Sequence, residues 1–476
     1  MKHGIFYNEL ATSIVPTLTV ATPTVCIGTA PIHLATDPAP VNTPILCNTY
    51  AEYVAQFGHS NEFSRYTICE AAAVHFALYN VRPVIFINVL DPAKHTESKS
   101  KTVTGLSNTV KVDCNAILST LTVTSGEATL KKGTDYTAAY DDDGYLEFTV
   151  TSSGRDKLTG DSATLSYNGV KPELVTTADI IGGVDQTTGK NKGLECINDV
   201  YPKYGVLPGS LIAPKYSTTP EVAAVMKSKV TNINGCFNTI ALCDIDTSTV
   251  KKYSDAYDYK NNNSLVDKNL VVCYPKVTLG GEQYHLSTHL AALMGRIDTS
   301  EGGDVPYISP SNHTLQIDGL CLADGTEVLL AKDQADYLNS VGIVTALNMN
   351  GWRAFGNYTS IFPSTTDSKD TFLCVRRMIH HVGNTIILTF WSFVDRPLNR
   401  RLIEAVETSS QLYLNGLSAS GALLGGTITF AEEDNPLTEL ISGNIKFHIS
   451  AGFVVPAQCI EFDIEFDTSL YQTLFS

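Results

Sequence analysis

The sequence predicts an α/β protein in which an all-β segment interrupts the α/β core and an α+β region follows it. Three observations lead to this fold class. Short apolar runs at residues 24–28 and 84–88 flank a helical pattern, as strands flank the helix of an α/β unit. After Asp91 and Pro92, alternating stretches rich in Thr and Ser replace that pattern. The last twenty residues alternate apolar and acidic side chains, which is typical of a strand with one buried face.

The first part of the core is expected within residues 21–96. Thr49, with Glu52 three residues later, predicts the cap of a short helix that ends at Gly58. A second helix is predicted over residues 64–79, because apolar residues recur there at helical spacing. The apolar runs on either side of these helices are predicted to be buried strands.

An inserted all-β domain is expected over residues 97–177. It contains alternating stretches and shows no helical period. Turns are predicted at three dipeptides that favour them, namely Ser125-Gly126, Asp143-Gly144 and Asn168-Gly169.

The α/β pattern resumes over residues 178–357, so the core domain is discontinuous. Strands are predicted in four apolar runs, at residues 211–213, 237–242, 270–273 and 343–347. Helices are predicted from Thr219 and over residues 285–296. Repeated strand–helix units imply a mainly parallel sheet with both faces covered.

An α+β domain is expected over residues 358–455, after a tight turn at Asn350-Gly351. We interpret the run that contains His380 as a strand. A helix is predicted from Pro397, and two strands are predicted in the runs at 427–434 and 444–455.

The two terminal segments both have strand-like patterns. The N-terminal arm, residues 1–20, carries a strand-like apolar set interrupted by Pro16, which consists of Ile14, Val15, Leu18 and Val20. The C-terminal strand, residues 456–476, places Ile460, Phe462, Ile464 and Phe466 on one face and Glu461, Asp463, Glu465 and Asp467 on the other. The pattern leaves open whether this strand is donated to a neighbour or folds back on its own chain.

The charge balance argues against nucleic acid as a partner. The 476 residues include 33 basic and 49 acidic ones, whereas phosphate binding needs a concentrated positive surface. An anionic membrane surface is disfavoured for the same reason. No apolar run approaches the length of a membrane span, and the N-terminus lacks a signal-peptide pattern, so we expect no membrane insertion and no secretion.

Eleven scattered cysteines without CxxC spacing indicate synthesis in a reducing cytoplasm. Most of them lie among apolar residues, where a reduced cysteine behaves as a small hydrophobe.

No catalytic, metal-binding or cofactor-binding site is predicted. The glycine-rich stretch from Gly182 has the wrong spacing for a phosphate-binding loop. His285 and His289 lack the glutamate of an HExxH zinc motif, and the stretch from Gly416 fails the GxSxG pattern at its last position. His380 and His381 follow Arg376 and Arg377, but this cluster is interpreted as structural.

The charges divide unevenly along the last hundred residues. Eight acidic residues and a single base, Lys446, lie between residues 431 and 476. Five arginines precede them, namely Arg376, Arg377, Arg396, Arg400 and Arg401. Either these are two separate solvated faces, or they are complementary surfaces of neighbouring copies.

The sequence resembles the phage tail sheath proteins, a family that also includes subunits of phage-tail-like bacteriocins and contractile injection systems. The resemblance rests on several motifs taken in order: IIGGVD (180–185) with PGSLIAPKYSTTPEV (208–222), RIDTSEGGDVPYISPSN (296–312), NGWRAFGNYT (350–359), VRRMIHH (375–381) and CIEFDIEFDTSLYQTLF (459–475). It covers both α/β segments and the C-terminal region, and it does not cover the β insert.

The resemblance implies a subtilisin-like core, without implying hydrolysis, and a β insert on the outer surface. It implies a helical polymer of copies of this chain around an inner tail tube protein, with a baseplate and tail terminator proteins as further partners. Sheath families exchange terminal strands between the C-terminal domains of neighbours. The protein would be assembled in the bacterial host cytoplasm, reside in a virion tail or tail-like particle, and contract without any cofactor to drive the tube through a target cell envelope.

Two other functions are compatible with the same sequence. One is a subtilisin-like hydrolase, active or inactive. The other is a surface-binding protein that uses the β insert as an adhesive domain.

Overall fold

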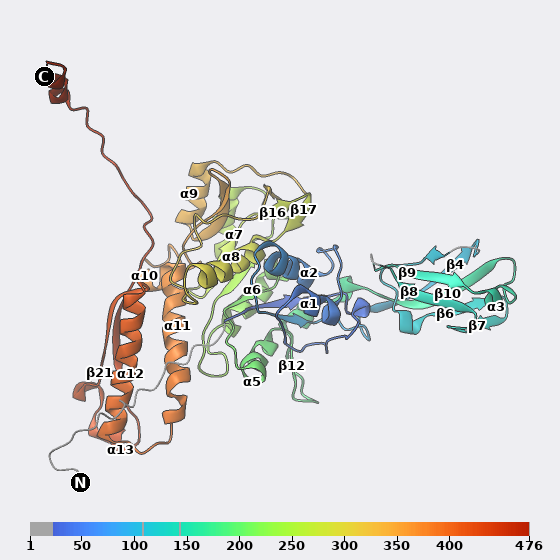
Figure 1. The fold of residues 1–476 in the computed structure, drawn as a ribbon, viewed down its shortest axis with the longest axis horizontal. Helices are drawn as coiled ribbons and strands as arrows, with labels where there is room; N and C mark the ends of the chain where they lie inside the picture. The colour runs from blue at the N-terminus through green and yellow to red at the C-terminus, as the bar shows by residue number, and fades with distance from the viewer. Residues whose placement is uncertain (1–21, 107–108, 142–143, 476) are drawn as a thin grey trace, which may run out of the picture.

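The computed structural model describes residues 22–106, 109–141 and 144–475. A central α/β body carries an elongated β domain at one end and a pair of long helices at the other (Figure 1). Beyond those helices, the C-terminal chain extends away from the body. The N-terminal arm, with Ile14, Val15, Leu18 and Val20, lies outside the described residues.

The body is built on an eight-stranded sheet. Six central strands run parallel, and the two edge strands, β2 and β20, pair antiparallel with their neighbours. In spatial order, the strands are β2 (Ile45–Cys47), β3 (Val84–Asn88), β1 (Thr24–Gly28), β13 (Ser210–Ile212), β14 (Ala241–Asp244), β15 (Leu270–Cys273), β19 (Ile343–Asn348) and β20 (Trp352–Phe355).

Apolar runs of the sequence form the central strands, but the strand predicted at 237–242 is shifted, since β14 spans Ala241–Asp244. Every residue of β1, β3, β14 and β15 is buried, so both faces of the sheet are covered. The covering helices include α1 (Tyr50–Phe57), α2 (Thr67–Ala72), α4 (Thr177–Ile181), α5 (Val200–Tyr204), α6 (Pro220–Lys229), α7 (Ala256–Asn262), α8 (Leu286–Ser300) and α9 (Lys332–Ser340).

Capping residues determine where the first helix begins and ends, as predicted. The Thr49 hydroxyl accepts a hydrogen bond from the Glu52 backbone N–H at 3.1 Å, which caps α1. Gly58 ends that helix with φ of 76°, a conformation that favours glycine. The predicted second helix consists of α2 and a π-helical continuation, Ala73–Leu78.

The insert is an all-β domain with its own core. One of its two sheets contains β4 (Thr96–Thr104), β10 (Ser162–Val170), β6 (Thr122–Ser125) and β7 (Ala128–Leu130). The other contains β5 (Val110–Lys111), β9 (Leu146–Val150) and β8 (Tyr136–Tyr140). The turn predicted at Asn168-Gly169 is wrong: both residues lie within β10, because nine consecutive pairs with β4 hold that strand extended.

Smaller elements connect the core. The glycine-rich stretch from Gly182 forms a hairpin of β11 (Gly183–Val184) and β12 (Asn191–Lys192). A separate three-stranded sheet contains β16 (Lys276–Leu279), β17 (Glu282–Tyr284) and β18 (Gly319–Cys321).

The C-terminal region pairs two long helices with a β-hairpin. Its main elements are α11 (Leu373–Phe390), α12 (Arg400–Ala419), β21 (Leu423–Thr429), α13 (Leu437–Ile441) and β22 (His448–Phe453). The strand expected around His380 is wrong, because this run lies inside α11. Its buried residues include Cys374, Met378, Val382 and Thr385, whose spacing is helical and gives the run one continuous inner face.

Candidate assembly interface

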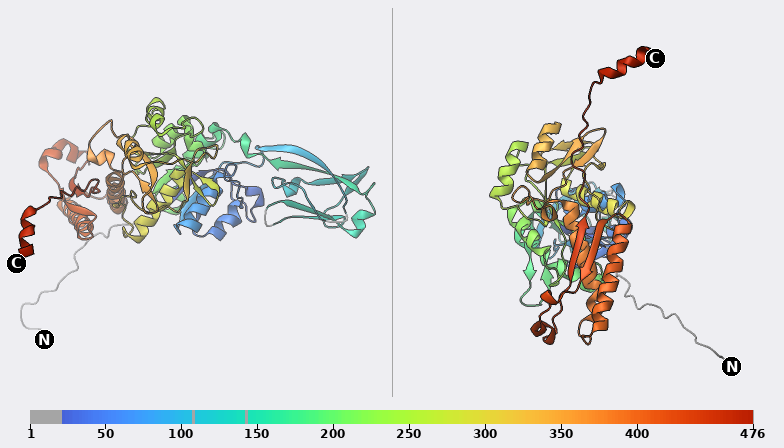
Figure 2. Two further views of the ribbon diagram at one scale, coloured as in Figure 1. Left: turned by 90° about the horizontal axis from the view of Figure 1, so that it is seen from above. Right: turned by 90° about the vertical axis from the view of Figure 1, so that its left-hand side faces the viewer.

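The C-terminal helices and hairpin form a small packed unit. Asn399 caps α12, since its side chain accepts a hydrogen bond from the Leu402 N–H at 3.0 Å. Leu414 and Leu417 of α12 pack with Leu423 of β21 and with residues of α11 in one apolar cluster. Figure 2 (right) shows the two strands alongside the long helices.

The hairpin is a sheet of only two strands, and its inner face is incompletely covered. On β22, Ile449, Ala451 and Phe453 pack toward the cluster but remain partly exposed. Two-stranded sheets are marginal in water and gain stability when further strands extend them. This hairpin can therefore accept more strands.

The outer edge of β22 is open. Thr427 of β21 stands opposite Ser450 of β22. The Gly426 carbonyl and the Ile428 N–H point away from β22, because both bind Gln411. Backbone groups alternate in direction along a strand, so Thr427 and Ser450 bond to each other. The N–H and C=O groups of Ile449 and Ala451 therefore point to the outer side of β22. No backbone partner for those outer groups lies within the described part of the chain.

The outer edge of β21 is covered by side chains of α12. The Gln411 amide donates to the Gly426 carbonyl at 2.8 Å and accepts from the Ile428 N–H at 3.2 Å. One step further along, the Glu407 carboxylate accepts from the Phe430 N–H at 2.9 Å. Sequence reasoning missed both residues, since only their four-residue spacing on the predicted helix was visible.

The C-terminal segment, residues 459–467, is extended and lies in no sheet of the described structure. Its four apolar side chains are highly exposed, with values of 70% for Ile460, 85% for Phe462, 94% for Ile464 and 73% for Phe466. The acidic residues Glu461, Asp463, Glu465 and Asp467 are exposed as well. The segment therefore does not fold back onto its own chain as a strand in this structure.

The chain end differs from the prediction. Residues Thr468–Phe475 form a 3-10 helix instead of continuing the strand. Asp467 starts it by accepting a hydrogen bond from the Ser469 N–H at 2.8 Å, because a carboxylate there satisfies a free backbone donor. The alternation of apolar residues also stops at Phe466, and this was the signal for the change.

The five arginines do not form one surface. Arg377 on α11 makes a two-bonded ion pair with Asp298 on α8, and its side chain is 9% exposed. Arg376 contacts Asn269 and Asp370 of its own chain. These two therefore have partners within the subunit, which argues against the predicted role in contacts between copies.

The other three arginines are exposed. Arg396 stacks on Phe393 at 4.5 Å, and Arg400 pairs with Glu404 one turn along α12. Arg401 is also exposed at the start of α12. Exposed pairs of this kind contribute little to folding, so these side chains are available to a partner.

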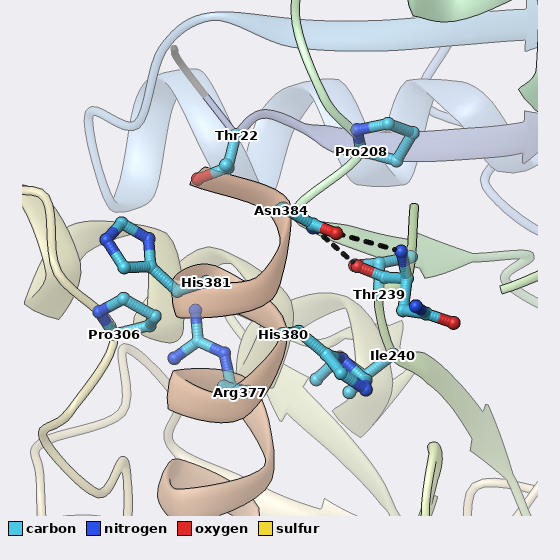
Figure 3. Close-up of a pocket in the computed structure, with 11 residues that line it drawn as sticks. Thr22, Pro208, Thr239, Ile240, Pro306, Arg377, His380, His381 and Asn384 are labelled. Atoms are coloured by element: carbon cyan, nitrogen blue, oxygen red, sulfur yellow. Dashed lines mark hydrogen bonds between the residues drawn. The ribbon is translucent and has the colours of Figure 1, made fainter. Parts of the chain in front are cut away.

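A small cavity lies where α11 meets the edge of the body (Figure 3). It measures about 40 Å³, and Asn384 closes one side through hydrogen bonds with the backbone of Asn238 at 2.8 and 3.1 Å. His380 is buried against it, and neither ring nitrogen has a partner among the described residues. Burial, together with three nearby cations led by Arg376, lowers the pKa of His380 to about 3.

The crevice at the carboxyl ends of the parallel strands is filled by a buried polar network. His285 Nδ1 lies 2.8 Å from the Glu70 carboxylate, and the Asp244 carboxylate binds Ser287. Burial alone would raise the pKa of Glu70, but the charge and hydrogen bonds of His285 outweigh it and lower that pKa. Burial raises the pKa of Asp244.

Enzymes of this architecture bind ligands in that crevice. Here Glu70, Asp244, His285 and Ser287 are all at most 6% exposed, so no reactive group of the network faces solvent. His289 is buried nearby, where it contacts Tyr79 and Tyr284 as a core residue. The network therefore stabilises the packing of α2 and α8 on the sheet.

Most cysteines are buried in the structure. All eleven cysteines are free, and eight of them are buried. None of the helices in the described ranges combines the length and apolar character needed to cross a bilayer.

Comparison with known proteins shows a similarity to phage tail sheath proteins. No family model matches it. It is 28% identical to the tail sheath protein of Burkholderia phage BcepMu, over 99% of this chain and 98% of that protein. It is also 24% identical to the tail sheath protein of Escherichia phage P2, over 57% of this chain and 66% of that protein.

Solved structures share the fold. The contracted helical sheath of the anti-feeding prophage matches with a TM-score of 0.58 at 15% identity, over 98% of this chain and 99% of that one. The sheath tail protein of Desulfitobacterium hafniense matches with a TM-score of 0.51 at 10% identity, over 90% and 93%. Over nearly its whole length the chain is similar to phage tail sheath proteins, which supports the role of a structural subunit of a contractile sheath.

Proposed function

We propose that copies of this chain polymerise into a helical tube around an inner tail tube, and that strands donated between C-terminal hairpins hold the polymer together. One observation carries this proposal. Each subunit has an exposed C-terminal segment with the pattern of a half-buried strand, and a two-stranded sheet with an open edge at β22. An exposed edge and an exposed strand on the same chain favour polymerisation.

The numbers of arms and edges support this arrangement. A subunit has two terminal arms, at residues 1–20 and 456–476, and its hairpin has two outer edges. If each arm adds to one edge of a different neighbour, every subunit gives two strands and receives two. Such a contact joins unlike surfaces, and a contact of this type that does not close on itself generates a helical polymer.

Contraction then follows as a change of packing between the bulky domains, while the backbone ladders between hairpins persist. The main-chain hydrogen bonds between hairpins stay intact while the surface contacts between the bulky domains change, so these ladders can act as hinges. The extended sheath would be metastable and would drive the tube through a target cell envelope on release, without a cofactor. The baseplate and the tail terminator would bind the two ends of the polymer.

The remaining regions have roles that fit this assembly. The α/β core, residues 21–96 and 178–357, would form the sheath wall with a subtilisin-like arrangement that has no catalytic function. The β insert, residues 97–177, projects from the body opposite the C-terminal helices and would decorate the outer surface (Figure 2). The sheath would reside in a virion tail or tail-like particle and assemble in the bacterial cytoplasm.

Truncation tests the proposal. A chain that ends at Cys459 lacks residues 460–476, whose side chains are largely exposed, so it should fold normally. We expect it to remain unassembled at concentrations where the full chain forms tubes in electron micrographs, with unchanged circular dichroism. Long tubes formed by the truncated chain would rule out strand donation.

A further inference from the structure

We infer that Gln411 and Glu407 form a removable plug on β21, and that the C-terminal segment of a second copy displaces them when it adds as a strand. This inference rests on the proposed strand donation and assigns the edge at which it occurs. The plug consists of the three hydrogen bonds that these two side chains make to the outer edge of β21.

The plug imitates a neighbouring strand. The Gln411 carboxamide has the same donor and acceptor as a peptide unit, and it uses both, toward Gly426 and Ile428. Residues four apart on a helix are separated by about 6 Å along its axis, close to the spacing of about 6.6 Å for residues two apart on a strand. Glu407 therefore reaches Phe430 in register. A strand that replaced the plug would recover every bond it broke.

The surroundings of this edge have room for apolar side chains. A groove of about 450 Å³ runs beside it, lined by Leu412 of α12 and Ile428 of β21 together with polar residues of α12. Leu412 is 52% exposed, so its side chain can still be buried by a partner. Neither side chain has a close-packed cover on this side in the single subunit.

The C-terminal segment of a second copy has the matching chemistry. Its four apolar side chains occur at alternate positions, as the groove requires, and all are at least 70% exposed. Its acidic residues would pass the start of α12, where Arg400 and Arg401 lie on the turns that precede Glu407. Glu404 and Glu407 lie on the same helix face and offset these two arginines, so the strict alternation of four exposed apolar residues, and not charge, favours the C-terminal segment at this edge.

The plug gives the subunit a means of avoiding premature association. An unpaired strand edge promotes uncontrolled pairing between chains, and proteins commonly cover such edges. Here two flexible polar side chains satisfy the edge until a strand with several hydrogen bonds and apolar side chains competes with them. Replacing the plug by a donated strand costs little free energy, because each hydrogen bond that breaks is replaced by another.

Hydrogen exchange at the edge tests this assignment. Replacing Gln411 by Ala, or by Leu to retain volume, leaves the Ile428 amide without its acceptor. In the unassembled subunit, we expect about tenfold faster exchange in the peptide that contains this amide, as follows from the loss of one hydrogen bond. Ser418→Ala on the same helix is the control and should leave exchange unchanged, because Ser418 bonds only within the helix.

Assembly should restore the protection. If a donated strand covers β21, the Ile428 amide of polymerised Gln411→Ala exchanges as slowly as in the polymerised parent chain. We also expect a threshold concentration for polymerisation about fivefold lower, since no plug has to be displaced. A polymer in which this amide still exchanges fast, or an unchanged threshold, would overturn the inference. Neither result would affect strand donation itself, which the truncated chain tests.

Disulfide trapping identifies the occupant. One preparation carries Leu412→Cys and another carries Ile464→Cys, both in a Cys459→Ser background to remove the exposed native thiol. We expect a covalent dimer only after the two preparations co-assemble. A further preparation carries Ser450→Cys on β22 in place of Leu412→Cys. A dimer with this variant, together with no dimer with Leu412→Cys, would place the segment at the other edge and contradict the inference.

Discussion

Arg377 on α11 and Asp298 on α8 join the C-terminal helices to the α/β body through a buried ion pair. The side chains are 9% and 12% exposed, and two hydrogen bonds connect the guanidinium to both carboxylate oxygens. Because neither charge can be solvated in place, the pair fixes the position of α11 against the body.

Breaking this pair should destabilise the protein. We expect Arg377→Ala to lower the free energy of unfolding by about 3 kcal/mol, because Asp298 keeps a buried charge without its partner. Urea unfolding followed by tryptophan fluorescence measures the change. The exposed pair of Arg400 and Glu404 provides the control, since Arg400→Ala should cost less than about 0.5 kcal/mol. Equal effects of the two substitutions would contradict the structural role of Arg377.

Acid should weaken the joint at α11 through His380. Its pKa falls from an ordinary 6.5 to about 3 in the folded protein, so the unfolded chain binds more protons between these values and stability falls as the pH falls below 6.5. At pH 5 the loss is about 2 kcal/mol. We expect His380→Met to reduce the difference in stability between pH 7 and pH 5 by this amount. An unaltered pH profile in His380→Met would refute the assignment.

The sequence anticipated the central sheet well, because its strands are short, apolar on both faces and bounded by clear turn residues. Thr24–Gly28 and Val84–Asn88 occur as predicted. The strand predicted around His380 was wrong. A helix that is buried on most sides is almost as apolar as a strand, and the β-branched residues of this run favour extended structure. Length was the better guide, since α11 spans eighteen residues, more than an ordinary strand, and Gly383 and Asn384 lie inside the helix without ending it.

The assembly interface was only partly predictable. The alternation from Ile460 to Phe466 is a local pattern and was visible in the sequence. The pairing of Arg377 with Asp298 and the contacts of Gln411 with β21 join residues that only the tertiary fold brings together. A list of arginines by sequence could not distinguish buried Arg377 from exposed Arg400.

The β insert should be removable. Its two connections to the body lie side by side, since Thr96 pairs with Val170, and its apolar core is separate from that of the body. We expect a chain in which a short Gly-Ser linker replaces residues 97–169 to fold and to form tubes. Electron microscopy and thermal unfolding would measure both properties. Insoluble protein, or soluble protein without tubes, would show that the insert is needed for the core or for assembly.

Arg400 should affect assembly through charge. We expect Arg400→Glu to raise the threshold concentration several-fold at 50 mM salt and to have little effect at 500 mM, where the Debye length falls to about 4 Å. Light scattering across a salt series measures this threshold. Lys132→Glu, an exposed site on the insert, makes the same change in net charge away from α12 and serves as the control. An effect of Arg400→Glu that persists at high salt would point to packing instead of charge.

The two faces of the C-terminal segment should differ sharply in their effect on assembly. Phe462 and Ile464 are 85% and 94% exposed in the subunit, and each would gain about 1.5–3 kcal/mol on full burial in a neighbour. If the segment binds as a strand, Phe462 and Ile464 share one face and Asp463 lies on the other. We therefore expect Phe462→Asp and Ile464→Asp each to raise the threshold concentration for polymerisation by tenfold or more, without changing the stability of the subunit. Asp463→Asn should change it less than about twofold at moderate salt. Sedimentation of polymers across a concentration series gives the thresholds, and comparable effects at all three positions would mean that the segment does not bind as a strand.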